Sequence, residues 1–249
     1  MPAMFRPLAE LTLNHVNIQE GDRVLDVACG TGIVASLVAE KVGPFGSVTG
    51  ADLNAGMIEA ARLYTPANTA NIEWHQNDVT SLPFEDASFD MAFYQQGLQF
   101  FSDKPAALSE LRRVLAPGGT LILTVWSAIS PLFAAVADSI GRFIGPEAST
   151  SVLSPFAFRD GEVIKALLME AGFPKVEIER LLVERRIGLA TESIPKEIAG
   201  SPVRELAAKL DEPTEKALYS EIEEALRDFV EDEGIVVPQE AHLVRAIRQ

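Results

Sequence analysis

A strand, a glycine turn and a helix follow one another between residues 24 and 35, where the sequence reads VLDVACGTGIVA. The run Val24–Val27 predicts a buried strand, and Gly30 and Gly32 predict that the strand ends in a tight turn. Apolar residues then recur at helix spacing, at positions 34, 37, 38 and 42. This order opens nucleotide-binding βαβ units, so the chain is predicted to be an α/β protein with a parallel sheet.

The same alternation continues through the first half of the chain. Strands are predicted at residues 24–27, 47–52, 71–76, 89–94 and 120–126, with helices at 7–16, 31–42, 55–63 and 105–115. The second half differs, with a helix at 160–171, a strand at 176–187, a mostly helical segment at 192–230 and a last strand at 234–247. We therefore expect a Rossmann-like sheet with an embellished C-terminal edge. The longest uncharged run, residues 114–137, contains two prolines and two glycines, which favours a buried strand between loops over a membrane span.

Composition bounds the organisation and the partners. The chain has 249 residues, 47% of them hydrophobic, and no Pro/Gly/Ser-rich linker divides it. One domain over 1–249 is therefore predicted, with a core at about 20–130 and a helical cap at about 188–233. A formal net charge of −15 repels nucleic-acid phosphates and anionic membrane surfaces, so neither is expected as a partner. One cysteine and no signal-peptide pattern at the start of the chain predict a cytoplasmic protein.

The glycine turn by itself fits more than one cofactor. Gly30, Gly32 and Ala35 match the dinucleotide spelling G-x-G-x-x-G/A. Asp52 follows about 20 residues later, where an acidic residue binds ribose hydroxyls in dinucleotide folds. Because this spacing suits any adenosine-containing ligand, a nicotinamide-dependent oxidoreductase stays open as an alternative.

Carboxylates near the turn favour a different ligand. Asp26, Asp52 and Asp78 fall at the carboxyl ends of the first three predicted strands, which line one crevice in an open α/β sheet. No Arg or Lys lies between positions 25 and 39 to offset a diphosphate. A ligand that carries a sulfonium and an ammonium fits such an acidic crevice better, and S-adenosylmethionine is that ligand.

The segment Asn77-Asp78-Val79 directly follows the third predicted strand. Here Asp78 can accept from an adenine amino group, while the Val79 amide donates to a ring nitrogen. The predicted sheet also ends in a late hairpin, where a full dinucleotide fold needs a second mononucleotide half. Both features favour S-adenosylmethionine again.

Five pieces of sequence stand in the order of one enzyme family. They are VLDVACGTG (24–32), GADLN (50–54) with Met57, NDVTSLPF (77–84), FD (89–90) and LRRVLAPGG (111–119). On these pieces the chain resembles a class I S-adenosylmethionine-dependent methyltransferase of the ubiquinone/menaquinone-biosynthesis type. The resemblance implies a seven-stranded, mostly parallel sheet with helices on both faces and a helical insertion before an antiparallel last strand. It also implies methyl transfer to a small-molecule acceptor, with S-adenosylhomocysteine as the product.

The resemblance further implies a cofactor site. At the methionine and ribose portions it places Asp26, Ala28, Gly30, Gly32, Asp52 and Gln95. At the adenine it places Leu53, Met57, Asn77, Asp78 and Val79. In these sets Asp26 lies on the ammonium side and Asp52 binds the ribose hydroxyls. Ala28 departs from the family, in which many members have a glycine.

The expected chemistry needs few catalytic groups. Transfer from a sulfonium is an in-line displacement without protonation of the leaving group, so alignment and exclusion of water are the main contributions of the protein. No general base stands out, and catalytic residues are left unassigned. The N-terminal helix and residues 192–230 are expected to form a lid that sets the choice of acceptor. A methyltransferase-like binding protein without turnover stays open as a second alternative.

Other polar residues receive the plainer interpretation. Cys29 is read as a small turn residue, and Gln96 is left open between capping of a loop and contact with the cofactor or substrate. The three histidines lie on separate predicted elements, and no H-x-x-x-H or C-x-x-C pattern occurs. No metal site is therefore expected.

Overall fold

A computed structural model of the chain describes residues 2–65 and 72–249. The chain divides into two compact units. Unit 1 comprises Met1–Ser127, Phe158–Leu181 and Ala241–Gln249, and unit 2 comprises Ala128–Ala157 and Leu182–Glu240. Position 71, where the third strand was predicted to begin, lies outside the described residues.

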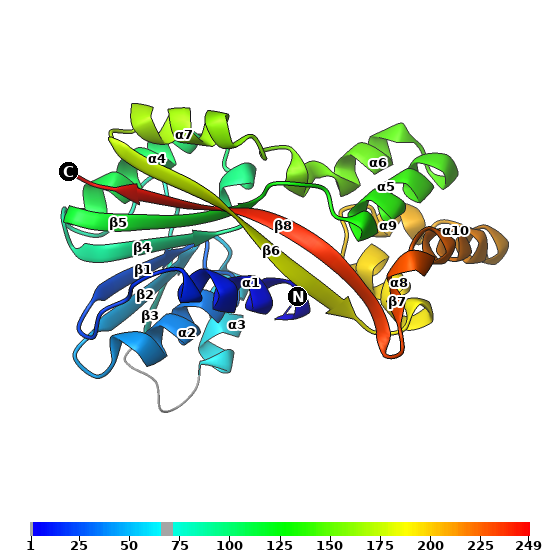
Figure 1. The fold of residues 1–249 in the computed structure, drawn as a ribbon, viewed down its shortest axis with the longest axis horizontal. Helices are drawn as coiled ribbons and strands as arrows, with labels where there is room; N and C mark the ends of the chain where they lie inside the picture. The colour runs from blue at the N-terminus through cyan, green and yellow to red at the C-terminus, as the bar shows by residue number, and fades with distance from the viewer. Residues whose placement is uncertain (1, 66–71) are drawn as a thin grey trace. The chain divides into compact units, whose positions relative to one another are not determined.

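The sheet has the predicted character, with one strand more than predicted. Over the described residues its eight strands are β1 (Arg23–Val27), β2 (Ser47–Asp52), β3 (Ile72–Gln76), β4 (Phe89–Gln95), β5 (Leu115–Trp126), β6 (Lys175–Ile187), β7 (Val230–Glu231) and β8 (Gly234–Ile247). The order is β3-β2-β1-β4-β5-β8-β6, with β7 paired to β8 (Figure 1). Neighbours from β3 to β5 are parallel, whereas β8 runs antiparallel to β5. The mostly parallel sheet with an antiparallel last strand is thus confirmed.

The predicted count of seven strands is wrong. The additional strand, β7, has two residues and pairs with the start of β8 through Val230↔Ile235 and Glu231↔Gly234. A pairing this short has no alternation of apolar and polar residues, so the sequence carries no periodic signal for it.

Helices cover both faces of the sheet in unit 1. They are α1 (Pro2–Asn14), α2 (Ile33–Val42), α3 (Ala55–Tyr64), α4 (Lys104–Val114) and α7 (Gly161–Glu170). On one face, α4 and α7 bury Leu108, Leu111 and Leu168 in one core with Leu121 and Leu123 of β5. Figure 1 shows α1 and α2 on the opposite face. Apolar residues at helix spacing against both faces of a hydrophobic sheet explain this layering.

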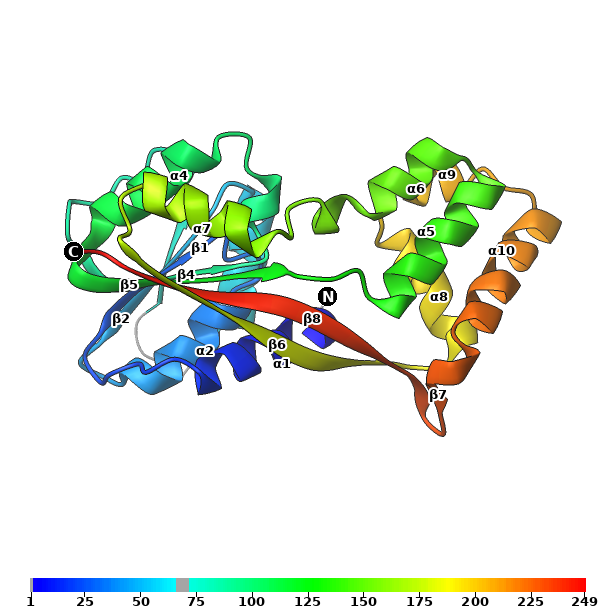
Figure 2. The same ribbon diagram turned by 45° about the horizontal axis from the view of Figure 1, so that its top comes forward.

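Unit 2 contains the helices α5 (Pro131–Phe143), α6 (Pro146–Val152), α8 (Ala190–Ala199), α9 (Arg204–Ala207) and α10 (Glu212–Ala225), drawn together in Figure 2. Their shared core includes Leu132, Ile140, Ile194, Leu218 and Ile222. The segment predicted as mostly helical, 192–230, accounts for α8 to α10. Within the described part of the chain, no helix is both long and apolar enough to cross a membrane.

Helix α5 corrects the interpretation of the uncharged run 114–137 as a strand between loops. The strand ends at Trp126, and α5 begins at Pro131, with Ser130 as its N-cap. The Ser130 side chain accepts a hydrogen bond from the Phe133 amide at 3.5 Å. A proline has no backbone N–H, and the first residue of a helix needs none, so Pro131 can begin α5. From the sequence, Pro131 was instead expected to interrupt the uncharged run.

Candidate cofactor and acceptor site

Two cavities open where the parallel strands β1 to β4 end. The β3-side cavity has a volume of about 330 Å³ and is lined by Val27, Ala28, Asp52, Leu53, Asn77, Asp78, Val79, Thr80 and Phe100, Phe101, Ser102 and Asp103. The β4-side cavity has a volume of about 180 Å³ and is lined by Phe5, Asp26, Ala28, Cys29, Gly30, Thr31, Ile33, Val34, Met57, Gln95 and Gln96. The two share Ala28. The structure therefore brings every predicted site residue except Gly32 to these two cavities.

The turn after β1 needs unusual backbone conformations. Ala28, Gly30 and Gly32 have φ angles of 50°, 54° and 79°, in the left-handed region that favours glycine. A Cβ at Gly30 would meet nothing within 4 Å, whereas a Cβ at Gly32 would lie 2.4 Å from the ring of Trp74. At Gly30 there is space for a Cβ beside the open cavity, whereas at Gly32 the Trp74 ring leaves no room for one.

Trp74 of β3 is a residue that the sequence reasoning missed. A Cβ at Gly50 of β2 would lie 2.2 Å from the same ring, so the indole needs a glycine on both β2 and the turn. The indole Nε1 donates to the Thr65 hydroxyl at 3.1 Å. Trp74 therefore fixes the turn against the strands from outside the two cavities.

Asp52 holds the turn from the end of β2. Its Oδ2 accepts from the Gly30 amide and its Oδ1 from the Asn54 amide, each at 2.9 Å. A carboxylate oxygen can accept more than one hydrogen bond, so both oxygens keep capacity for a ligand in the β3-side cavity. The next residue, Leu53, is 66% exposed and supplies an apolar surface at the same place.

Asp78 forms a short turn at the end of β3. Its Oδ1 accepts from the Thr80 amide at 2.9 Å and from the Thr80 hydroxyl at 2.8 Å. These two donors lower the pKa of the Asp78 carboxyl, so it is ionised at neutral pH. Because both bonds go to Oδ1, Oδ2 is oriented by the turn and is left to accept from a ligand.

Asp26 differs from the other two carboxylates because it is buried. Its side chain is 1% exposed, and its Oδ2 accepts from the Ala35 amide at 3.0 Å. Burial raises the pKa of Asp26 to about 8, against the opposing hydrogen bond from Ala35 and with a further increase from the nearby charge of Asp52. At neutral pH this group is therefore mostly protonated and adds little negative charge to the crevice.

Cys29 lies beside Asp26 in the β4-side cavity. Burial raises the pKa of its thiol, and the nearby carboxyl groups of Asp26 and Asp52 raise it further. A protonated thiol is a weak nucleophile, which agrees with a turn-forming role. Among the described residues, no group of three or more His, Cys, Asp or Glu side chains could hold a metal ion.

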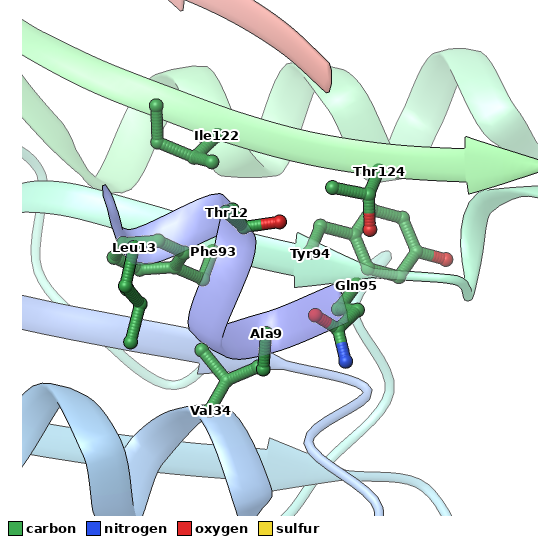
Figure 3. A pocket seen from close by; sticks show the side chains of 9 residues that line it. All are labelled: Ala9, Thr12, Leu13, Val34, Phe93, Tyr94, Gln95, Ile122 and Thr124. Carbon is green, nitrogen blue, oxygen red and sulfur yellow. The ribbon is translucent and has the colours of Figure 1, made fainter. Parts of the chain in front are cut away.

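Gln95 connects the end of β4 to α1. Its Nε2 donates to the Phe5 carbonyl at 3.2 Å, and Phe5 also lines the β4-side cavity. Behind Gln95 lies a cavity of about 10 Å³, which Figure 3 shows between α1 and strands β4 and β5. Thr12 of α1 and Thr124 of β5 both line it. The first helix is thus joined to the edge that carries the site.

Gln96, whose role the sequence leaves open, is a further residue of the candidate site. It lines the β4-side cavity, is 6% exposed and has a left-handed φ of 57°. Its side-chain Oε1 accepts from the backbone amide of Trp126 at 3.1 Å, and its backbone amide donates to the Thr124 carbonyl at 2.8 Å. The two adjacent glutamines indicate polar contacts at this strand end, and both line the cavity. Nothing in the sequence indicates that Gln96 is the buried one of the two.

The donor set fits the predicted cofactor. Asp52 and Asp78 offer carboxylate oxygens to hydroxyl and amino groups, and the exposed side chains of Leu53 and Met57 offer apolar contact to a planar base. Among the described residues, no Arg or Lys lines either cavity, so a diphosphate would have no cationic partner from them there. The residues present therefore suit S-adenosylmethionine.

Comparison with known proteins supports the same conclusion. A family described as a methyltransferase domain matches residues 24–119. The demethylmenaquinone methyltransferase of Staphylococcus epidermidis is 35% identical over 173 residues, which are 65% of this chain and 71% of the relative. A ubiquinone/menaquinone biosynthesis C-methyltransferase of Francisella philomiragia is 33% identical over 184 residues, 68% of this chain and 74% of the relative.

Solved structures with the same fold extend over nearly the whole chain. The YcgJ protein of Bacillus subtilis superposes with a TM-score of 0.64 at 21% identity, covering 97% of each chain. A Haemonchus contortus phosphoethanolamine N-methyltransferase, in complex with phosphomonomethylethanolamine and S-adenosylhomocysteine, gives a TM-score of 0.59 at 20% identity over 97% of this chain and 52% of that one. At these identities the similarity establishes the fold.

Fold, site and relatives together define an S-adenosylmethionine-dependent methyltransferase. With more than two thirds of each relative covered, the chain belongs to the class I methyltransferases of the ubiquinone/menaquinone-biosynthesis type. It is an enzyme that transfers a methyl group from S-adenosylmethionine to a small-molecule acceptor. The predicted class, cofactor and activity are confirmed, and the proteins named above favour neither the oxidoreductase nor the binding protein without turnover.

Proposed function

We propose that the enzyme methylates a ring carbon of a quinol. The observation that carries the proposal is its similarity to relatives named for demethylmenaquinone and for ubiquinone/menaquinone C-methylation, over more than two thirds of their length. An oxidised quinone ring is electron-poor, whereas the reduced quinol donates electrons from its hydroxyl oxygens into the ring. A carbon of the reduced form is therefore the better nucleophile.

The side chains at the strand ends would hold the cofactor. Asp52 would accept from the ribose hydroxyls while it keeps its bonds to Gly30 and Asn54. Asp78 Oδ2 would accept from the adenine amino group, with Leu53 and Met57 against the base. The Val79 amide would donate to an adenine nitrogen, beside Asn77. Around the methionine portion, the backbone from Ala28 to Gly32 would approach closely, and Gln95 and Asp26 would face it.

The lining of the β4-side cavity suits an acceptor that needs no enzymic base. Its ionisable side chains, Asp26 and Cys29, have raised pKa values and hold their protons at neutral pH. The protein would therefore align the acceptor and exclude water. When bound, the cofactor would supply an electrophilic methyl group. The ring carbon would bond to it as the carbon–sulfur bond breaks, with the electron pair staying on sulfur, and the ring would lose its proton to bulk solvent after the transfer.

The test is methyl transfer to 1,4-naphthoquinol under anaerobic conditions. We expect mass spectrometry to locate the new methyl group on a ring carbon, with 1,4-naphthoquinone inactive under the same conditions. Methylation on oxygen, or cofactor binding without any transfer to the quinol, would contradict the proposal.

Two further expectations concern location and partners. The net charge of −15 supports the exclusion of nucleic acid, and a gel-shift measurement with duplex RNA checks it. A cytoplasmic location rests on the sequence pattern and is checked by fractionation of cells. Both stay predictions.

A further inference from the structure

Unpartnered polar atoms gather at the carboxyl ends of β4 and β5. Among the described residues, five side-chain atoms there are buried from solvent and have no hydrogen-bond partner: Nε2 of Gln96, Oε1 of Gln99, Oγ of Ser127 and the hydroxyl oxygens of Tyr94 and Thr124. Native proteins rarely leave buried polar atoms unpaired, because desolvation without a new bond costs free energy. Five such atoms at two neighbouring strand ends therefore need an explanation.

Gln96 has a fixed orientation. Its Oε1 accepts from the Trp126 amide at 3.1 Å, and a backbone N–H can only donate, so the oxygen and nitrogen of this carboxamide cannot be exchanged. The remaining atom, Nε2, is consequently a donor. Since Gln96 is 6% exposed and lines the β4-side cavity, this donor is withdrawn from bulk solvent beside the site of methyl transfer.

The backbone holds this arrangement against its own preference. Gln96 has a φ of 57°, which costs a residue with a Cβ more than it costs glycine. A hydrogen bond from its backbone amide to the Thr124 carbonyl, at 2.8 Å, holds it there. The next residue has to be a glycine, because a Cβ at Gly97 would lie 2.2 Å from the Tyr94 ring. Strained residues of this kind concentrate at functional sites.

Gln99 completes a pair with Gln96. Its Nε2 donates to Gln96 Oε1 at 3.4 Å, so the two carboxamides are in contact. The atoms left over are one donor, on Gln96, and one acceptor, on Gln99. A hydroxyl matches this set because it accepts and donates, whereas a carboxylate only accepts and an ammonium only donates.

We propose that Gln96 and Gln99 bind a hydroxyl group of the methyl acceptor. Gln96 Nε2 donates to the hydroxyl oxygen, and Gln99 Oε1 accepts its hydrogen. The inference rests on the proposed function, since a quinol carries the aromatic hydroxyl that this pair selects. It goes further by assigning the acceptor contact to two residues and by excluding acceptors whose hydroxyl is masked.

The test compares binding of 1-naphthol and 1-methoxynaphthalene to the enzyme saturated with S-adenosylhomocysteine. We expect the wild-type enzyme to bind 1-naphthol at least about tenfold more tightly, the effect of one well-placed hydrogen bond. Gln99→Met removes the acceptor for the hydroxyl hydrogen, which only 1-naphthol carries, and should reduce the preference to about twofold or less. Gln96→Glu keeps an acceptor for Trp126 but removes the donor to the oxygen that both probes carry, so it should weaken binding of 1-methoxynaphthalene by about threefold or more. The matched control, Gln19→Glu, alters an exposed glutamine outside both cavities and should keep the wild-type preference.

The outcomes separate this inference from the proposed function. Equal binding of the two probes by the wild-type enzyme overturns the assignment of Gln96 and Gln99. So does an unchanged preference in Gln99→Met together with unchanged 1-methoxynaphthalene binding in Gln96→Glu, each at unchanged melting temperature. In that case the naphthoquinol assay still decides the proposed function. If the wild-type enzyme binds S-adenosylhomocysteine but neither probe, the hydroxylated aromatic acceptor is wrong, and both proposals fall.

Discussion

The two halves of the strand-end edge are prepared to different degrees. At the ends of β1, β2 and β3, the carboxylates of Asp26, Asp52 and Asp78 are already held by backbone amides. At the ends of β4 and β5, Gln96 and Gln99 keep polar atoms without partners among the described residues. The proposed cofactor half is thus organised by the chain itself, whereas the proposed acceptor half has hydrogen-bonding capacity that only a further molecule can satisfy.

Both halves of the strand-end edge lie in unit 1. Every residue that lines the two cavities belongs to unit 1. We keep as a proposal that residues 188–233 act as a cap that sets acceptor choice. The strongest test of the contrast is therefore to remove the cap and measure the two halves separately.

Deletion of residues 188–233 should have the largest effect. We expect methyl transfer to fall below detection, while calorimetry gives an S-adenosylhomocysteine affinity within about threefold of the intact enzyme, a change below 1 kcal/mol. The deletion also removes Ile194 and Leu218 from the core around α5, so affinity for the cofactor product is the measure of whether unit 1 is intact. Equal loss of binding and transfer would contradict the separation.

Asp26 should make stability depend on pH. Its folded-state pKa of about 8 lies above the ordinary value of 3.8, so the folded state holds the proton more tightly than the unfolded state. Stability is therefore highest below about pH 4 for this group and declines as pH rises towards 8, by an amount on the order of 5 kcal/mol in full. Urea unfolding of the wild-type enzyme and Asp26→Asn across this range isolates the contribution.

The substitution keeps a neutral side chain that can accept from Ala35. Its unfolding free energy should be flatter with pH than that of the wild-type enzyme, and the two curves should diverge as pH rises. Parallel curves would show that the Asp26 carboxyl is ionised in the fold and that all three carboxylates contribute charge to the crevice.

The two glycines of the turn are expected to have different roles: Gly30 faces the cavity, and Gly32 packs against Trp74. Gly32→Ala should lower the free energy of unfolding by about 2–3 kcal/mol, because a new Cβ overlaps the Trp74 ring. Gly30→Ala has open space around its Cβ, so its cost should be about 1 kcal/mol from the left-handed φ, with a clear loss of S-adenosylhomocysteine affinity. Reversed effects in thermal unfolding and calorimetry would mean that the two glycines have exchanged roles.

Ala28→Gly should give the smallest effect. Ala28 has a φ of 50°, which glycine adopts without steric cost, although glycine also increases the entropy of the unfolded chain. These opposing terms leave an expected gain of about 0–1 kcal/mol in unfolding free energy, with cofactor affinity unchanged. A marked loss of affinity would show that the Ala28 methyl group itself contacts the ligand.

Much of unit 1 could be predicted because its helices and strands have clear local sequence patterns. The apolar run of β1, the glycines after it and the recurring apolar residues of α2 each follow from periodicity and turn chemistry. The carboxyl ends of parallel strands meet at one edge, so Asp26, Asp52 and Asp78 could be grouped without knowing any contact. Gly32, by contrast, was grouped with them but lines neither cavity, because its constraint comes from Trp74.

The remaining features depend on contacts that no local pattern contains. Helix α5 follows β5 within one uncharged run, so no change in composition separates the two elements. Ser130 and Pro131 are typical of a helix start, but they are equally typical of a loop. The inward side chain of Gln96 depends on the Trp126 amide, which is 30 residues away in sequence. The raised pKa of Asp26 depends on burial, which composition does not reveal.

The central claim is that the strand-end edge of unit 1 is a preorganised S-adenosylmethionine site with Asp52 at its centre. Calorimetric titration of S-adenosylhomocysteine into the wild-type enzyme and Asp52→Ala tests it most directly, with Asp138→Ala, an exposed carboxylate of α5, as the matched control. The account predicts micromolar binding for the wild-type enzyme and the control, and an affinity lower by about 100-fold or more for Asp52→Ala, which loses charged hydrogen bonds to the ligand. Equal affinity of Asp52→Ala and the wild-type enzyme would contradict the account.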